Sequence, residues 1–308
     1  MTRDALEAQL RAILAERYHD RHPFNLRMHA GALTPDEIRT WVRNRYYYQT
    51  RIPIKDGIIL AKSEDPAFRR GWIRRIHDHD GDGAREGGLE LWLRLAEAVG
   101  LDPGNVAALR DVLPGVRRAC DAYVRFVSGH DLLESVAASL TELAAGGLMA
   151  ERIACFEEHY PWVKTDGLRY FRSRTEQAPR DAAEGLRHVL DGAATEEDQA
   201  RALHALERKC EILWELLDGV EWGAERLRLA VGARLREDAE GPVVVLAERA
   251  VKLNESGRAI LALADGERTV CGVAGALRAR HPEPPELERE CYAFLEQMQR
   301  LGVLERAG

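Results

Sequence analysis

The chain has 308 residues, 45% of them hydrophobic, and a formal net charge of −7 at pH 7. This length and apolar content predict a globular protein of two domains, and the acidic balance excludes a general nucleic-acid binder, which needs a basic face. The charged N-terminus and the lack of a twenty-residue apolar window argue against a signal peptide and a membrane span, so we expect a cytoplasmic protein. Five cysteines, never paired as Cys-x-x-Cys, favour reduced thiols over disulfides or a zinc site.

Residues 3–222 have apolar side chains spaced three and four apart, which predicts seven or eight helices. Thr34-Pro-Asp-Glu37 is a capping box with proline at the first helical position, and it predicts a helix that runs to about Lys62. Thr195 is expected to begin another long helix that ends near Gly223. Residues 80–88 hold four glycines and predict a loop, because each glycine inside a helix costs about 1 kcal/mol relative to alanine.

The pattern changes after about residue 224. Residues 227–236 and 243–253 are predicted to be two strands of a β-hairpin, with its turn at Glu240-Gly241-Pro242. Three short helices and a final strand are then expected: one capped by Asn254 and ended by Asp265-Gly266, one over residues 269–280, one over residues 285–301, and the strand at Val303. We therefore predict a mainly α protein, with a helical bundle over residues 1–223 and a small α+β, winged-helix-like domain over residues 224–308.

Three polar residues share one face of the predicted second helix. Arg45 and Tyr48 are three positions apart, and Arg45 and Gln49 are four apart. A cation, a phenol and an amide on one helix face could form one side of a binding site for a planar acid. The alternative is a tyrosine-rich helix that packs in the core with its hydroxyl groups at the rim.

A second pair at helical spacing is Arg75 and His79, which end a predicted helix just before the glycine-rich loop. Histidine has an unperturbed pKa close to neutrality, so His79 is a candidate general acid or base. A structural or surface histidine is the competing interpretation.

Further polar residues interrupt otherwise apolar helical stripes: Tyr123, Glu142, Arg152, Tyr170, Arg174 and Lys209. Glu142 would be expensive to bury alone, so we expect it to pair with a cation or to take part in proton chemistry. Five cations distributed over several helices of an acidic protein would suit a polycarboxylate ligand: Arg45, Arg75, Arg152, Arg174 and Lys209. Each of them alone could equally lie on a solvated face.

Metal and nucleotide sites have no clear signature in the sequence. No Glu-x-x-His motif occurs, and no glycine-rich phosphate loop follows a strand. Glu184 and His188 are four apart and could share a metal ion, but an exposed helix face is the favoured interpretation. We therefore predict neither a metal nor an organic cofactor.

Several motifs together resemble the pyrroloquinoline-quinone synthase family, in order from about residue 8 to 223: YHDRHPF, WVRNRYYYQTRIPIKD, RRIHDHDGDG, DAYVRF, SLTEL, HYPWVK, YFRSRTEQAPRD and KCEILWELLD. The resemblance implies a seven-helix bundle related to heme oxygenases and thiaminase-like proteins, usually a homodimer. It also implies that a tricarboxylic amino-acid intermediate is ring-closed and oxidised by eight electrons. Dioxygen would be the co-substrate, no metal or flavin would take part, and hydrogen peroxide would be released.

The same resemblance assigns roles to residues one position at a time. Four residues correspond to catalytic positions: His79, Tyr170, Arg174 and Lys209. Nine correspond to substrate-binding positions: Tyr18, His19, Arg45, Tyr48, Gln49, Arg75, Tyr123, Glu142 and Arg152. Met149 departs from the family, which places a second pocket histidine there, and methionine cannot transfer a proton.

The tail resembles the small peptide chaperone of the same pathway, through ERAVKLNESGRAIL and DGERTV. This resemblance implies that residues 224–308 bind the precursor peptide at a sheet edge and present it to a radical-SAM enzyme. We therefore predict a bifunctional protein, an oxidase fused to a peptide-binding module. Two alternatives remain open: a non-catalytic scaffold of the pathway, and a metal-dependent oxidase of the same bundle fold that acts on another substrate.

Overall fold

The computed structural model describes residues 1–238, 241–247, 249–281 and 286–307. The chain divides into two compact units, one formed by Met1–Leu109 with Gly115–Asp218 and the other by Arg110–Pro114 with Gly219–Gly308. The division after Asp218 falls inside a long helix, a few residues before the domain boundary predicted from the sequence.

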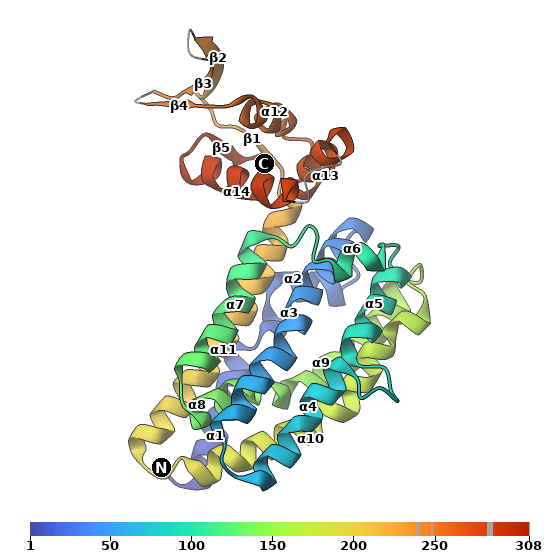
Figure 1. Ribbon diagram of the computed structural model, residues 1–308, viewed down its shortest axis with the longest axis vertical. Coiled ribbons are helices and arrows are strands. Elements are labelled where there is room, and N and C mark those ends of the chain that lie inside the picture. The colour runs from blue at the N-terminus through green and yellow to red at the C-terminus, as the bar shows by residue number, and fades with distance from the viewer. Residues whose placement is uncertain (239–240, 248, 282–285, 308) are drawn as a thin grey trace. The chain divides into compact units, whose positions relative to one another are not determined.

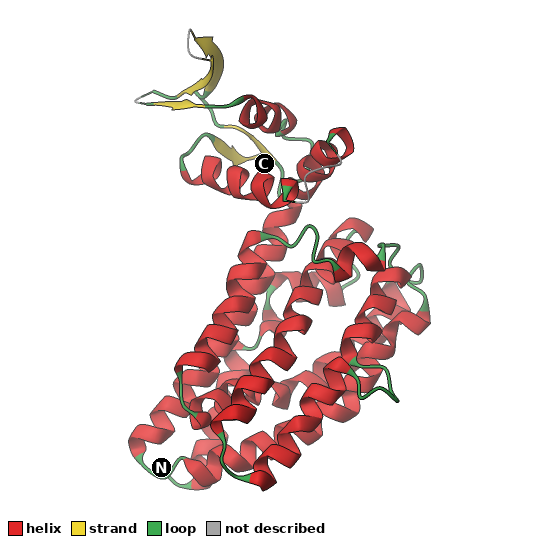
Figure 2. Cartoon of the chain, in the orientation of Figure 1, coloured by secondary structure: helices red, strands yellow, loops and turns green. Residues whose placement is uncertain are grey.

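The first unit is helical throughout (Figures 1 and 2). Its α-helices, two of which continue into the second unit, are α1 (Arg3–Arg17), α2 (Pro23–His29), α3 (Pro35–Lys62), α4 (Pro66–Asp80), α5 (Gly88–Ala98), α6 (Pro103–Ala107), α7 (Pro114–Gly129), α8 (Leu132–Ala137), α9 (Glu142–His159), α10 (Arg169–Gly192) and α11 (Glu196–Ala224). Three 3-10 turns join them: η1 (His19–Arg21), η2 (Ala138–Thr141) and η3 (Thr165–Leu168). The predicted seven or eight helices correspond to the long ones, whereas the short helices α2, α6 and α8 were not expected.

Local signals start and stop the helices that carry the polar residues. The Thr34 side chain accepts a hydrogen bond from the Glu37 amide, and the Glu37 carboxylate accepts one from the Thr34 amide, so the predicted capping box begins α3. The predicted loop also separates α4 from α5. A Cβ atom on Gly87 would lie 2.3 Å from the Gly81 nitrogen and 2.4 Å from the His79 carbonyl oxygen. The loop therefore packs directly against the end of α4 that carries His79, and only glycine fits there.

Aromatic side chains form the centre of the bundle. Trp41 of α3 lies 5.5 Å from Trp92 of α5 and 6.3 Å from Phe171 of α10, measured between ring centroids. Residues 132–159 are long and apolar enough to cross a membrane by length and composition. They form α8, η2 and α9, and 56% of their most apolar window is buried inside the protein. Their apolar character is therefore explained by packing in the bundle core.

Beyond the end of α11, the described residues of the second unit form two small antiparallel sheets and three helices. Strand β1 (Leu227–Leu229) pairs with β5 (Leu304–Arg306), and β2 (Arg234–Asp238), β3 (Gly241–Val245) and β4 (Ala250–Lys252) form a sheet in that order. The helices are α12 (Glu255–Leu263), α13 (Val270–Arg280) and α14 (Leu287–Arg300). Asn254 caps α12 as predicted, and Thr269 caps α13.

The predicted hairpin is correct in its pairing but wrong in its strand bounds. Residues 227–236 form two strands of different sheets, separated by a turn in which Gly232 has a φ of 91°. The strand predicted over residues 243–253 is likewise interrupted after Val245, and β4 begins at Ala250. Gly241 and Pro242, predicted as the turn, belong to β3. Glu240 and the predicted helix start at Pro285 lie outside the described residues.

Candidate active site

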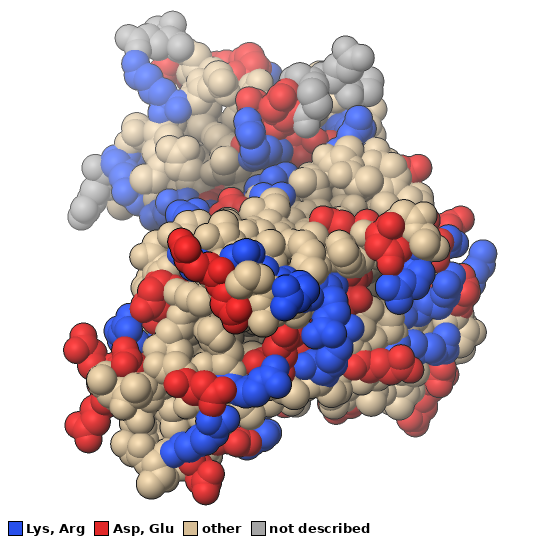
Figure 3. Space-filling view, turned by 60° about the horizontal axis from the view of Figure 1, so that its bottom comes forward, with Lys and Arg blue, Asp and Glu red and all other residues tan. Residues whose placement is uncertain are grey.

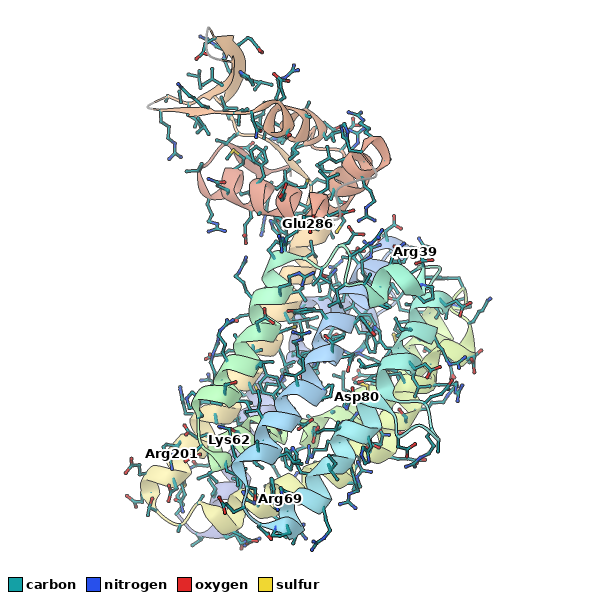
Figure 4. The ribbon with its side chains drawn as sticks, viewed as in Figure 1. Arg39, Lys62, Arg69, Asp80, Arg201 and Glu286 are labelled. Carbon is teal, nitrogen blue, oxygen red and sulfur yellow. The ribbon has the colours of Figure 1, made fainter. Side chains whose placement is uncertain are left out.

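Side chains drawn as sticks fill the interior of the helical bundle (Figure 4). A cavity of about 70 Å³ lies inside this unit. Its walls come from α3, α4, α9, α10 and α11, with Tyr18 at the end of α1 and Thr141 of η2. The lining residues are Tyr18, Arg45, Tyr48, Gln49, Ile52, His79, Thr141, Glu142, Ala145, Met149, Tyr170, Arg174 and Leu213.

His79 occupies the last turn of α4 and is 4% exposed. Its Nδ1 atom lies 3.0 Å from the carbonyl oxygen of Arg75. A carbonyl only accepts hydrogen bonds, so Nδ1 carries the proton and Nε2 is the free acceptor. Burial, and then repulsion by the nearby Arg174, lower the pKa of His79 to about 3. His79 is therefore neutral at physiological pH and able to accept a proton.

An ionic wall stands beside His79. Arg75 and Arg174 both contact Glu142: Arg75 Nη1 donates to Glu142 Oε2, and Arg174 Nη2 lies 3.5 Å from Glu142 Oε1. Asp181 of α10 adds a second carboxylate, 3.5 Å from Arg174 Nη1. Burial opposes ionisation of Glu142, but attraction by Arg75 and Arg174 outweighs it and lowers the pKa of Glu142. Arg180 also pairs with Asp181 and with Asp78, so the three arginines here are balanced by three carboxylates.

Three other buried cations have no carboxylate partner among the residues that the structure describes: Arg45, Arg152 and Lys209. The Arg45 guanidinium lies 4.1 Å from the centre of the Tyr48 ring, and Lys209 Nζ donates to Tyr48 Oη at 2.9 Å. Arg152 donates to Asn25 Oδ1 at 3.0 Å. On the face shown in Figure 3, in contrast, Lys and Arg side chains are intermixed with acidic ones.

The crowding of these cations changes how they ionise. Burial, and then Arg45, lower the pKa of Arg152 to about 10. Burial, and then Arg45 and Lys55, lower the pKa of Lys209 well below its usual range. His19 is affected in the same way by burial and Arg45, and neither of its ring nitrogens has a hydrogen-bond partner. A bound anion would therefore be stabilised electrostatically in this part of the bundle.

The structure places all thirteen predicted site residues in or directly behind the cavity wall. Eight line the cavity: Tyr18, Arg45, Tyr48, Gln49, His79, Glu142, Tyr170 and Arg174. Five lie behind them, buried: His19, Arg75, Tyr123, Arg152 and Lys209. Tyr170 Oη donates to Gln49 Oε1 at 2.8 Å, and the Tyr123 ring faces Lys209 Nζ at 3.5 Å. Met149 lines the cavity where the family resemblance implies a histidine. The catalytic and binding roles of these residues stay predictions.

Several residues of this ionic network were missed in the sequence: Lys55, Asp56, Trp72, Ser139 and Asp181. One signal was present, because Lys55 and Asp56 stand together inside the apolar run 52–60, where opposite charges indicate a buried pair. The alternative metal pair has other neighbours. Glu184 lies 3.6 Å from Arg74, and the His188 ring packs on Phe68.

Two solved structures share the fold of the helical unit. A domain of unknown function with a heme oxygenase-like fold from Shewanella denitrificans OS217 has a TM-score of 0.56 at 13% identity, covering 71% of this chain and 89% of that one. A TenA homolog from Pseudomonas syringae pv. tomato str. DC3000 has a TM-score of 0.57 at 15% identity, covering 72% and 96%. The predicted fold class is therefore confirmed.

Residues 7–219 match the model of the TENA/THI-4/PQQC family, and the chain belongs to that family. A pyrroloquinoline-quinone synthase from Rhizobium rhizogenes is 50% identical over 218 residues, which is 71% of this chain and 88% of that protein. A bifunctional coenzyme PQQ synthesis protein C/D from Methylorubrum extorquens is 36% identical and covers 99% of this chain and 96% of its own length. Residues 242–304 match the model of coenzyme PQQ synthesis protein D, so the predicted order of the two modules is confirmed.

Proposed function

We propose that the helical unit completes the synthesis of pyrroloquinoline quinone. In this proposal the cavity binds a tricarboxylic amino-acid intermediate, closes its last ring and removes eight electrons. Dioxygen is the oxidant and hydrogen peroxide is released. Support comes from the synthases that are about 50% identical to this unit and from the chemistry of the cavity.

One observation carries the proposal: Arg45, Arg152 and Lys209 are buried without a carboxylate partner among the described residues. Burying a charge that has no counter-ion costs several kcal/mol, so such cations are retained where a ligand supplies the counter-ions. Three of them match the three carboxylates of the intermediate. Arg75 and Arg174 are already paired with Glu142 and Asp181, so the wall beside His79 is nearly neutral.

The neutral wall suits proton chemistry. His79 Nε2 can accept a proton from a substrate carbon, and the imidazolium that forms would be stabilised by Glu142, the carboxylate that raises the pKa of His79. The carbanion of the forming quinone can then pass electrons to dioxygen near Tyr170 and Arg174. Met149 fills its position without taking part in proton transfer.

The size of the cavity adds a requirement. Pockets that hold drug-sized ligands have volumes of about 300–1,000 Å³, whereas this cavity measures about 70 Å³. A multi-ring substrate therefore enters only when the walls separate, and the structure corresponds to a contracted site.

Titration of the full chain with pyrroloquinoline quinone, itself a tricarboxylate, tests the proposal. Removing one partner of a buried charge pair costs about 2–5 kcal/mol, so Arg152→Met should raise Kd by at least about 30-fold. Arg201→Met is the matched control, because Arg201 lies on the same unit but pairs with Asp131 and Asp198 at the surface. Equal Kd values for wild type and Arg152→Met would refute the tricarboxylate site.

For the second unit we propose a peptide-binding role: the precursor peptide adds as a strand to an outer strand of the β2–β3–β4 sheet and is presented to a radical-SAM enzyme. The match of residues 242–304 to the protein D model supports this role. A homodimeric, cytoplasmic protein is part of the same proposal.

A further inference from the structure

Two consecutive residues of α3, Lys55 and Asp56, are each 1% exposed and form an ion pair in which Lys55 Nζ lies 2.7 Å from Asp56 Oδ1. Neither lines the cavity, and neither has a role in the proposed chemistry. A buried ion pair is weak support for stability, because the loss of hydration offsets the attraction between the charges. The contacts of each partner therefore indicate what the pair does.

Asp56 supports the wall that carries His79. Its Oδ1 atom accepts a hydrogen bond from Trp72 Nε1 at 2.9 Å. The guanidinium of Arg75 in turn packs over the Trp72 ring, with its Cζ atom 3.8 Å from the ring centroid. Arg75 donates to Glu142, and Glu142 faces the cavity. A continuous set of contacts thus runs from Asp56 through Trp72 and Arg75 to the cavity carboxylate.

Lys55 supports a second part of the site, around Lys209. Its ammonium donates to Ser139 Oγ at 3.0 Å, and Ser139 Oγ also lies 3.2 Å from the Tyr123 hydroxyl. Ser139 donates its own hydrogen to the Ser135 carbonyl at 3.4 Å, so Tyr123 is the donor in its bond to Ser139. The Tyr123 ring faces the ammonium of Lys209. Lys55 thus fixes the aromatic ring on which one of the unpaired cations rests.

We propose that Lys55 and Asp56 are positioning residues that hold the two cavity walls relative to each other, Asp56 through the Arg75–Glu142 pair and Lys55 through Tyr123 and Lys209. This inference rests on the proposed function. Because the two residues are adjacent on one helix and ion-paired, a displacement of one wall is transmitted to the other. Lys55 also contributes positive potential that lowers the pKa values of Glu142 and Lys209.

The proposal predicts different kinetic effects for the two residues. Asp56→Asn should lower kcat about tenfold or more with little change in KM, because its contacts lead to the proton-transfer wall. Lys55→Met should raise KM for the tricarboxylic intermediate, and Kd for pyrroloquinoline quinone, about tenfold or more, because its contacts lead to the anion-binding wall. Both variants are made in the full chain and measured by steady-state kinetics and titration.

The double variant Lys55→Met/Asp56→Asn separates positioning from folding. It removes both buried charges, so its Tm should return towards the wild-type value while kcat and KM remain impaired. Val106→Ala serves as a stability control, since Val106 is buried in α6, away from the ionic network. Two results would overturn this inference but leave the proposed function standing. One is wild-type kcat and KM in the double variant. The other is single variants whose kcat and KM are impaired no more than those of a control variant with the same Tm. A wild-type chain that neither binds pyrroloquinoline quinone nor turns over the intermediate would overturn the proposed function and the inference with it.

Discussion

At the residue scale, the environment of His79 sets the direction of proton transfer. Its pKa of about 3 leaves the ring neutral, and the hydrogen bond to the Arg75 carbonyl leaves Nε2 as the base. We therefore expect His79→Ala to lower kcat by about 10²- to 10⁴-fold, the usual contribution of a general base, while Kd for pyrroloquinoline quinone changes little. Oxygen consumption and product titration measure the two effects. Normal oxygen consumption by the variant would contradict the assignment.

The pH dependence of His79 follows from the same pKa. A base acts in its deprotonated form, so His79 protonation should reduce kcat/KM only as the pH falls towards 3, and not through the ordinary histidine range near 6.5. The contrary result would be a fall in wild-type kcat/KM below about pH 6.5 that is absent from His79→Gln. Such a profile would show that the His79 ring has an ordinary histidine pKa.

Lys209 gives a second test at this scale. Burial and the neighbouring cations lower its pKa in the empty cavity, and carboxylates of a bound ligand would raise it again. Ligand binding should therefore take up a proton, and affinity should increase as the pH falls from the pKa of Lys209 in the complex to its lower pKa in the free enzyme. Titration calorimetry in two buffers of different ionisation enthalpy measures this uptake. The uptake should be smaller in Lys209→Met, and a buffer-independent heat in the wild type would argue against it.

Residue patterns in the sequence predicted part of this site. The spacing of Arg45 and Tyr48 placed them on one face, and the structure has the Arg45 guanidinium over the Tyr48 ring. The convergence of Arg152 and Lys209 on the same region could not be derived from spacing, since it depends on how α9 and α11 pack. Only the family resemblance suggested it.

At the element scale, local signals located helices better than strands. Thr34 and Asn254 cap helices where their hydrogen-bonding patterns predicted. Strand β1 was merged with β2 because its partner β5 lies near the other end of the second unit's sequence, and a local pattern carries no information about a pairing at that distance.

Strand register makes the peptide-binding proposal testable. Leu253 N donates to Pro242 O, and Leu246 N donates to Arg249 O, both at 2.8 Å. Bonded pairs alternate in an antiparallel ladder, so the Ala250 amide points away from β3. Ala250→Pro should therefore remove a donor available to an added strand while it keeps the β3–β4 ladder, and should weaken binding of the precursor peptide in calorimetry of the full chain.

The other outer strand supplies the matched control. By the same register the Leu235 amide of β2 also points outward, but β2 carries the charged residues Arg234, Arg236, Glu237 and Asp238, which discourage strand addition. Leu235→Pro should leave peptide affinity unchanged. Loss of binding in Leu235→Pro with normal binding in Ala250→Pro would place the peptide on β2 instead.

At the scale of the whole molecule, composition predicted two globular units, and the resemblance supplied what composition could not, namely the pathway they share. The bifunctional relative from Methylorubrum extorquens aligns over nearly the full chain, so the two modules occur together in another protein of this kind. A peptide-binding module fused to the final enzyme would couple the first and last stages of one synthesis in a single chain.

Turnover by the purified full chain tests the central claim most directly. When the tricarboxylic intermediate is added in air-saturated buffer, we expect pyrroloquinoline quinone to appear by its absorbance together with hydrogen peroxide, and both to be abolished without dioxygen. Arg201→Met should behave as the wild type, and His79→Ala should lose most of the peroxide signal. Tight binding of the intermediate with no oxygen consumption and no peroxide would contradict the oxidase and identify the helical unit as a scaffold that binds the intermediate.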